Sequence, residues 1–233
     1  VVNTTLAGST AANYSGSGST LLNNLVQANS GGFSLGANLA LKGNFTVNSS
    51  RSFDLGGYTL TIGGSYTNSG TLTANAFGST LHFNGGAAQT LTGGSYTGSF
   101  IANVISNNTH ANGLNLNVNA ANSFGHITVN SGAYLQAANV LLNVKGNIVN
   151  NGTFFTNGGN STTQLAINRS SPQTISGSGS FSQITTNAGT GRFPRMTVDN
   201  AAGLVLNQDI TIQNALNLTI GEISGSATLT LGT

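Results

Sequence analysis

"TLTIGGSYTNSGTLTAN" (59–75) and "LLNVKGNIVNNGTFFTN" (141–157) present nearly the same phrase twice in one chain, with the apolar positions kept and most polar positions changed. Apolar and polar residues alternate in both stretches, as at Leu60 and Ile62. This period of two is that of a β-strand, and a helix cannot bring such residues onto one face. The two stretches therefore predict short strands that recur along the chain.

The repetition extends beyond these two stretches. A constant shift aligns 45–75 with 127–157, and "AAQTLTGGS" (87–95) then meets "SPQTISGSG" (171–179). A third, truncated copy begins near "RFPRMTVDNAAGLVL" (192–206). The chain is expected to form one continuous domain over 1–233, with internal units at approximately 19–98 and 99–189 and a partial unit over 190–233.

The composition narrows the class of protein. Charged residues make up 4% of the 233 residues, against about a quarter in an ordinary soluble domain. The 33 glycines and the absence of cysteine favour many short strands joined by tight turns, without disulfides. A net charge of +2 is too small for a nucleic-acid surface. No apolar run is long enough for a membrane span. Because the chain begins with Val1 and its only methionine is Met196, we expect a processed form or an excised piece.

Three all-β architectures remain: a sandwich, a closed barrel and a solenoid. In a solenoid each coil stacks on its neighbour, so the same coil sequence can recur many times along the chain. Apolar residues recur about 20 residues apart, from Ile62 to Phe83 and from Leu72 to Leu91. The sequence therefore predicts a right-handed parallel β-helix with roughly 20 residues per coil, in which the inward side chains fill an axial core.

The acidic residues are Asp54, Asp199, Asp209 and Glu222. Glycoside hydrolysis needs two carboxylates about 5 to 10 Å apart, and a calcium site needs several oxygen ligands together. Asp199 and Asp209 are half a coil apart and are expected to face different sides. We therefore expect no catalytic, metal-binding or cofactor-binding residue in this chain.

The histidines give no catalytic set either. His82 alternates with Leu81 and Phe83 and is expected to point outward from a strand, whereas His110 and His126 are expected to lie in turns. None is spaced from a carboxylate or another histidine as paired metal ligands are.

Two local patterns suggest surface binding. "GRFPRM" (191–196) is a small concentration of positive charge that could touch an anionic glycan or a membrane surface, although a loop with proline at a unit boundary explains it as well. "TLT" occurs at 59–61, 71–73, 90–92 and 228–230, and flat ranks of Thr-x-Thr would suit ice binding. Their irregular separations do not establish such an array.

"MTVDNAAGLVLNQDITIQNALNLTIGEISGSATLTLG" (196–232) resembles the repeat of very large secreted surface proteins of Bacteroidetes-type bacteria, and "LHFNGGAAQTLTGGS" (81–95) resembles the phrase that precedes that repeat. The resemblance covers most of the chain, from about Ser19 to Thr233. It implies a non-enzymatic, exported β-solenoid at the cell surface or outside the cell, used as a stalk, adhesin or fibre.

The residues and the resemblance together predict a structural or adhesive element at the bacterial cell surface, without enzymatic activity. The expected partners are a second copy, head-to-tail or lateral, and surface glycans. The strand pattern "SATLTLGT" (226–233) has no evident cap, which suggests that this end continues into another domain or docks on a partner. A polysaccharide-binding or polysaccharide-cleaving β-helix is the alternative, and an ice-binding solenoid a lesser one.

Overall fold

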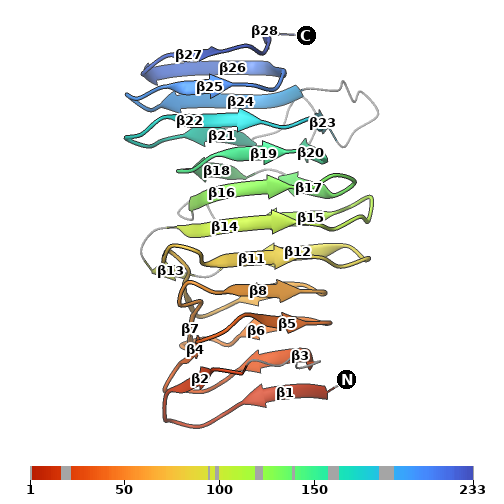
Figure 1. Ribbon diagram of the computed structural model, residues 1–233, viewed down its shortest axis with the longest axis vertical. Helices are drawn as coiled ribbons and strands as arrows, with labels where there is room; N and C mark the ends of the chain where they lie inside the picture. Colours follow the sequence, from red (N-terminus) through yellow and green to blue (C-terminus); the bar gives the residue numbers. More distant parts are fainter. Residues whose placement is uncertain are drawn as a thin grey trace.

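The chain winds into a parallel β-solenoid in the computed structural model, with its two ends at opposite ends of a tall stack of strands (Figure 1). There are about nine turns of roughly 21 residues each, so the predicted all-β coil and its length per turn are confirmed. The structure describes residues 2–16, 22–93, 95–97, 100–118, 123–137, 140–156, 163–183 and 192–232, without the side chains of 95–97, 183 and 192.

Every recorded strand pairing is parallel, and the pairings run along three stacks, which we call faces A, B and C. Face A contains β5 (Leu39–Leu41), β8 (Thr59–Ile62), β11 (Thr80–Phe83), β14 (Ile101–Ser106), β16 (Ser123–Val129), β19 (Ile148–Asn150), β22 (Gln173–Ser176), β25 (Leu204–Leu206) and β27 (Ile223–Gly225).

Face B contains β1 (Val2–Leu6), β3 (Leu22–Gln27), β6 (Phe45–Val47), β9 (Tyr66–Asn68), β12 (Gln89–Thr92), β15 (Leu114–Asn117), β17 (Tyr134–Ala137), β20 (Thr153–Thr156) and β23 (Ser180–Gln183). Near the C-terminal end, β28 (Leu229–Leu231) pairs with the first residues of β26 (Ile210–Ile220).

Face C begins with β2 (Ala12–Tyr14), β4 (Phe33–Leu35), β7 (Ser52–Asp54), β10 (Thr71–Thr73) and β13 (Ser95–Thr97). It continues through the first residues of β14 and β16 to β18 (Leu141–Val144), β21 (Gln164–Ile167), β24 (Arg192–Asp199) and the later part of β26. The chain passes from A to B to C in each turn.

The core is an axial column of inward side chains. Ile62 and Phe83 are paired in adjacent turns of face A and are fully buried, as predicted. The predicted equivalence of Leu72 with Leu91 is wrong. Leu72 lies on face C above Phe53, whereas Leu91 lies on face B above Tyr66. The loops between strands vary in length, so a spacing close to one turn can join residues of two different faces.

The sequence repeat and the structural turn are out of phase. The alignment of the two copies matches β8 with β18, but β8 belongs to face A and β18 to face C. In the same way β9 of face B matches β19 of face A. The repeated unit is not a whole number of turns, so the second copy is rotated about the axis by one face.

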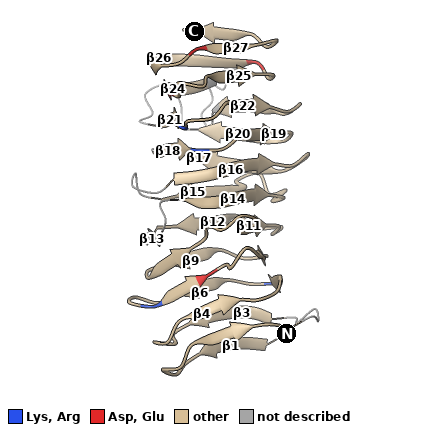
Figure 2. Ribbon diagram, turned by 60° about the vertical axis from the view of Figure 1, so that its left-hand side comes forward, with Lys and Arg blue, Asp and Glu red and all other residues tan. Residues whose placement is uncertain are grey.

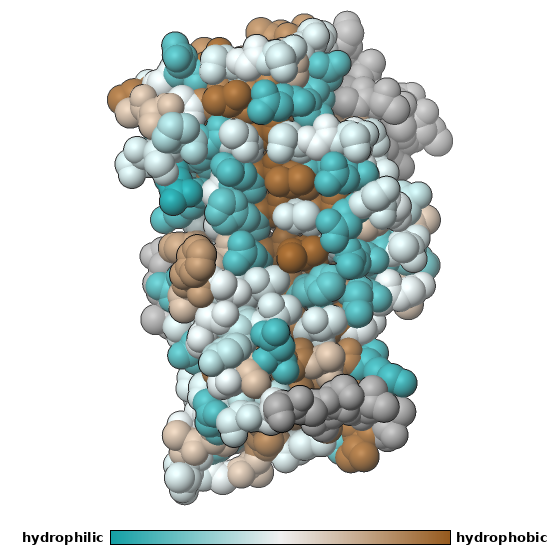
Figure 3. Space-filling model, viewed as in Figure 1, coloured by the Kyte–Doolittle hydropathy of each residue, from teal (hydrophilic) through white to brown (hydrophobic). Residues whose placement is uncertain are grey.

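The outer surface is polar but almost uncharged. Lysine, arginine and acidic residues are few and scattered along the stack (Figure 2). The face seen in Figure 3 is mainly teal and white, with brown areas along its middle and at its edges. Within the described ranges, no helix is long and apolar enough to cross a bilayer.

Candidate functional site

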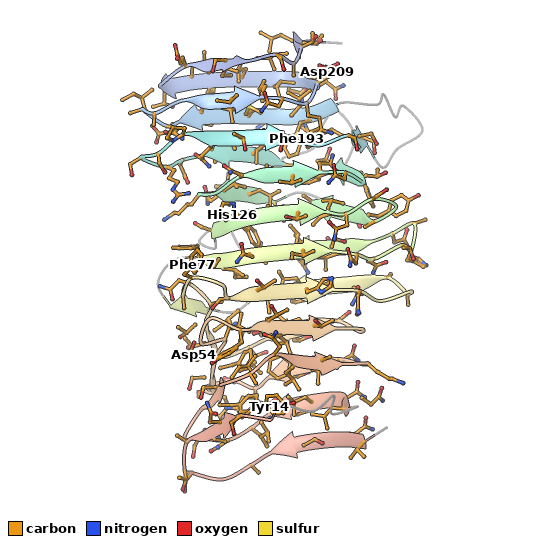
Figure 4. All side chains as sticks on the ribbon, viewed as in Figure 1. Tyr14, Asp54, Phe77, His126, Phe193 and Asp209 are labelled. Atoms are coloured by element: carbon orange, nitrogen blue, oxygen red, sulfur yellow. The ribbon has the colours of Figure 1, made fainter. Side chains whose placement is uncertain are left out.

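A groove of about 520 Å³ runs along the corner where the chain passes from face C to face A. Its walls come from the turns that lead into β11, β14, β19 and β22 and from the strands β14 and β16 themselves. Phe77 and His126, labelled at different heights on one side of Figure 4, both line it. We call it the corner groove. Its volume lies within the usual range for ligand pockets, about 300 to 1,000 Å³.

Small residues in successive turns make the floor of the corner groove. A Cβ atom on Gly125 would lie 2.2 Å from the backbone oxygen of Ala102, and one on Gly146 would lie 2.4 Å from that of Gly125. Side chains cannot occupy this space, because the backbones of adjacent turns already touch there. The floor of the corner groove is therefore main chain at Gly125 and Gly146, with no side chain on it.

Aromatic rings border the lower part of the corner groove. Phe77 is fully exposed at 103%, and Phe100 is half-buried. Figure 3 shows a brown projection at the edge and height where Figure 4 labels Phe77. One turn below, Tyr58 is also exposed at the same corner. Exposed rings on consecutive turns offer flat apolar surface to a ligand.

Two cationic side chains border the upper part of the corner groove. The Nζ atom of Lys145 lies 5.9 Å from the centre of the Phe100 ring, so the ammonium group rests over the aromatic face. The exposed Arg169 lines the corner groove beyond it. The chain has six basic residues in all, so two of them at one groove is a concentration. Of the four acidic residues, all within the described ranges, none lines this groove.

His126 lies between the rings and the cations. The backbone N–H of Asn147 donates a hydrogen bond to His126 Nδ1 at 3.0 Å. Partial burial in the corner groove, together with the charge of Arg169, lowers the pKa of His126. The ring is therefore neutral at pH 7, and because Nδ1 accepts a hydrogen bond, Nε2 carries the proton and serves as a donor. The expectation that His126 lies in a turn is wrong, since it belongs to β16.

The other two histidines lie away from the corner groove. His82 is on the outer side of β11, as predicted, and burial lowers its pKa. His110 lies in the turn that precedes β15, as predicted, and its backbone oxygen accepts a hydrogen bond from the Gly113 N–H at 2.7 Å.

The carboxylates are dispersed and two of them hold turns. Asp54 Oδ1 accepts the Gly56 N–H at 2.9 Å, and Asp209 Oδ1 accepts the Thr228 N–H at 2.7 Å. Asp209 immediately precedes β26, whereas Asp199 is paired with Ile220 at the other end of that strand. Among the described residues, no three His, Cys, Asp or Glu side chains are grouped so that they could hold a metal ion.

The structure places the two surface patterns differently from expectation. "FPRM" (193–196) belongs to strand β24 and not to a loop, and Phe193 is fully buried against Phe154 and Phe181. Arg195 is exposed, while Gly191 and the side chain of Arg192 lie outside the described residues.

The "TLT" stretches lie on all three faces, in β8, β10, β12 and β28. Above Thr59 and Thr61 on face A, the next turn places Thr80 and His82. The stretches therefore do not stack into a flat threonine array.

The sequence did not predict the corner groove because its wall residues come from five successive turns. A signal is present, since an aromatic or cationic residue precedes β8, β11, β19 and β22 by a few positions. It becomes visible only once the strands of face A are known. No family model, no curated protein and no solved structure matches this chain.

Proposed function

We propose that this chain is an extracellular structural and adhesive β-solenoid without enzymatic activity, displayed at a bacterial cell surface. The observation that carries the proposal is the pairing of parallel strands along three faces from β1 to β28. Each turn is held to its neighbours by main-chain hydrogen bonds and by inward apolar side chains, which makes a stiff rod. Such a rod suits a stalk or a fibre.

The side chains outside the core support an adhesive role. Asn, Ser and Thr side chains cover much of the surface, and side-chain amides of adjacent turns form hydrogen bonds with one another. Asn23 Nδ2, for example, donates to Asn3 Oδ1 at 3.1 Å. The corner groove adds a hollow with exposed rings, to which the apolar face of a sugar ring can bind. Surface glycans are therefore the partners that this chemistry fits.

The test is a panel of neutral and acidic polysaccharides, scored for both retention of the protein and release of products. We expect the chain to be retained by at least one polymer while neither reducing ends nor unsaturated sugars accumulate. Accumulation of product that D199N or D209N abolishes would instead make the chain a polysaccharide-cleaving enzyme.

Self-association is a second proposed property, favoured by the apolar surface of the last turns. Leu218, Ile220 and Leu231 are exposed at 57%, 52% and 63%, and within the described residues the later part of β26 pairs on one edge, with β24. A free strand edge with apolar neighbours and little charge favours addition of another strand. Sedimentation velocity should show larger species at high protein concentration and their loss in L218D/L231D. Monomers at every concentration would exclude this property.

A further inference from the structure

Six successive turns each place one ring or one cation along the same corner. In order along the axis these residues are Tyr58, Phe77, Phe100, His126, Lys145 and Arg169. Adjacent turns are about 4.8 Å apart, so the row is roughly 24 Å long.

The spacing of this row fits a linear polymer whose repeating unit is about as long as one turn is high. A chain of sugar rings meets this condition and can set successive rings against successive turns. Because Gly125 and Gly146 line the corner groove without side chains, such a chain can approach the main chain closely there. On the walls, the exposed Asn75 carries an amide of the kind that binds hydroxyl groups. The Nδ2 of the half-buried Asn103 donates to the backbone oxygen of Ser79 at 3.0 Å, so this residue presents its Oδ1 as an acceptor.

The charge in the corner groove selects an anionic polymer. Lys145 and Arg169 are both cationic, and a guanidinium group binds a carboxylate through two parallel hydrogen bonds. The neutral His126 adds a donor at Nε2. With no acidic residue of the described chain on its walls, nothing in the groove opposes a carboxylate.

The cations lie only in the upper part of the row, where Lys145 rests over the Phe100 ring, and this uneven distribution argues against a nucleic acid as the ligand. A single-stranded nucleic acid carries a charge on every unit and is bound by cations distributed along the groove. Here the half that holds Tyr58 and Phe77 has no cation on the walls of the corner groove. A polysaccharide can place carboxylates at the cations and uncharged ring faces at the aromatic residues.

We propose that the corner groove binds a linear acidic polysaccharide that contains uronate carboxylates, laid parallel to the solenoid axis. This inference rests on the proposed adhesive function and specifies the ligand of its groove. Two matched probes test it: polygalacturonate and its methyl-esterified form, which have the same backbone but differ in charge. Binding is measured by affinity electrophoresis and by titration calorimetry at low ionic strength, where surface electrostatic attraction is greatest.

Three variants are compared with the unmodified chain. K145Q/R169Q removes the two groove cations. F77A removes a fully exposed ring, so its folding is not at risk. K42Q/R51Q removes the same charge from residues that do not line the corner groove. Circular dichroism and the unfolding midpoint establish that each variant is folded.

We expect polygalacturonate to bind about fivefold or more tightly than the ester. K145Q/R169Q should abolish this preference, F77A should weaken binding of both polymers, and K42Q/R51Q should leave the preference intact. Equal binding of the two polymers, equal effects of the two charge variants, or tighter binding of an oligothymidylate would each overturn the acidic-glycan inference. Those outcomes leave the adhesive function standing, whereas retention by no polysaccharide of the panel would remove that function too.

Discussion

The side-chain oxygen of Gln89 accepts a hydrogen bond from Asn108 Nδ2 at 2.9 Å, and both residues are buried between successive turns. The amide of Gln89 in turn donates to the backbone oxygens of Ile62 and Gly64 in the turn below. One buried glutamine thereby joins three turns at a corner and adds a donor to the backbone oxygens there, among them that of Ile62, which also accepts the Asn84 N–H.

The second copy of the repeat builds the same contacts. Gln173 donates to the backbone oxygens of Val144 and Gly146 at 2.9 and 2.7 Å, and its side-chain oxygen accepts from Asn200 Nδ2 at 2.8 Å. Gln89 lies on face B and Gln173 on face A. The repeated unit therefore keeps its local contacts although the second copy is rotated about the axis. These contacts explain why a polar residue such as glutamine is the same in both copies when most other polar positions differ.

Replacing Gln89 by leucine should destabilise the chain by about 2 to 5 kcal/mol. The substitution removes the acceptor of the Gly85 N–H and the side-chain donor to the Gly64 oxygen, and it takes away one of two partners from the Ile62 oxygen and from Asn108 Nδ2. Each buried group left without a partner costs about 1 to 3 kcal/mol. Urea unfolding followed by circular dichroism measures the loss. T92V, on the outer side of the same strand, is the control and should change stability by less than about 0.5 kcal/mol. Equal midpoints for Q89L and T92V would contradict the assigned role.

Two phenylalanines provide a second matched pair. The fully buried Phe154 packs against Phe181 and Phe193, with ring centres 5.6 and 5.8 Å away. F154A should cost about 3 to 5 kcal/mol, because it removes buried apolar surface and leaves a cavity. F77A should cost almost nothing, since that ring is already exposed to solvent. Thermal unfolding of both variants measures the difference, and a large loss in F77A would show that Phe77 is packed in solution.

The sequence predicts the coil well because its main signal is an average over many turns. Alternation of apolar residues, as at Leu60 and Ile62, recurs in strand after strand, and both residues are fully buried. A single spacing is a weaker signal, as the misassigned pair of Leu72 and Leu91 shows.

The corner groove could not be predicted from the sequence, for a related reason. Phe100 and Lys145 are distant in sequence and meet only because three faces and variable loops bring their turns to one corner. His126 was misplaced because "FGHITV" (124–129) contains a glycine at which the strand bends and does not end. Local sequence propensity cannot tell whether a strand bends or ends at a glycine. Here the close approach of Gly125 to the backbone of Ala102 in the adjacent turn keeps the strand continuous.

Two glycines in turns should respond in opposite ways to alanine. Gly177 has a φ of +128°, and a Cβ atom there would lie 2.1 Å from the backbone oxygen of Asn150. G177A should therefore be strongly destabilised, by about 2 kcal/mol or more. Gly86 has no atom within 4 Å of such a Cβ and no left-handed φ, so G86A should be neutral or stabilised by up to about 1 kcal/mol. Urea midpoints measure both, and loss of stability in G86A equal to that in G177A would show that space and backbone angle do not govern these turns.

Acid should weaken the fold through two of its histidines, His82 and His126. Burial lowers the pKa of His82, and burial together with Arg169 lowers the pKa of His126. Both histidines therefore bind a proton less readily when the chain is folded than when it is unfolded. Above about pH 6.5 both states hold neutral rings and stability is unaffected. As the pH falls below that value, the unfolded chain takes up protons first, so the free energy of unfolding decreases until the folded-state pKa values are passed.

Protonation of His126 Nδ1 would also remove the acceptor for the Asn147 N–H, which adds to the loss. We expect the urea midpoint to fall between pH 7 and pH 5 in the unmodified chain. H82N/H126N should show a much smaller fall, because asparagine does not titrate and can still accept a hydrogen bond. H110N, which removes a histidine from the turn before β15, is the matched control. Identical pH profiles for all three chains would mean that these histidines do not couple protonation to folding.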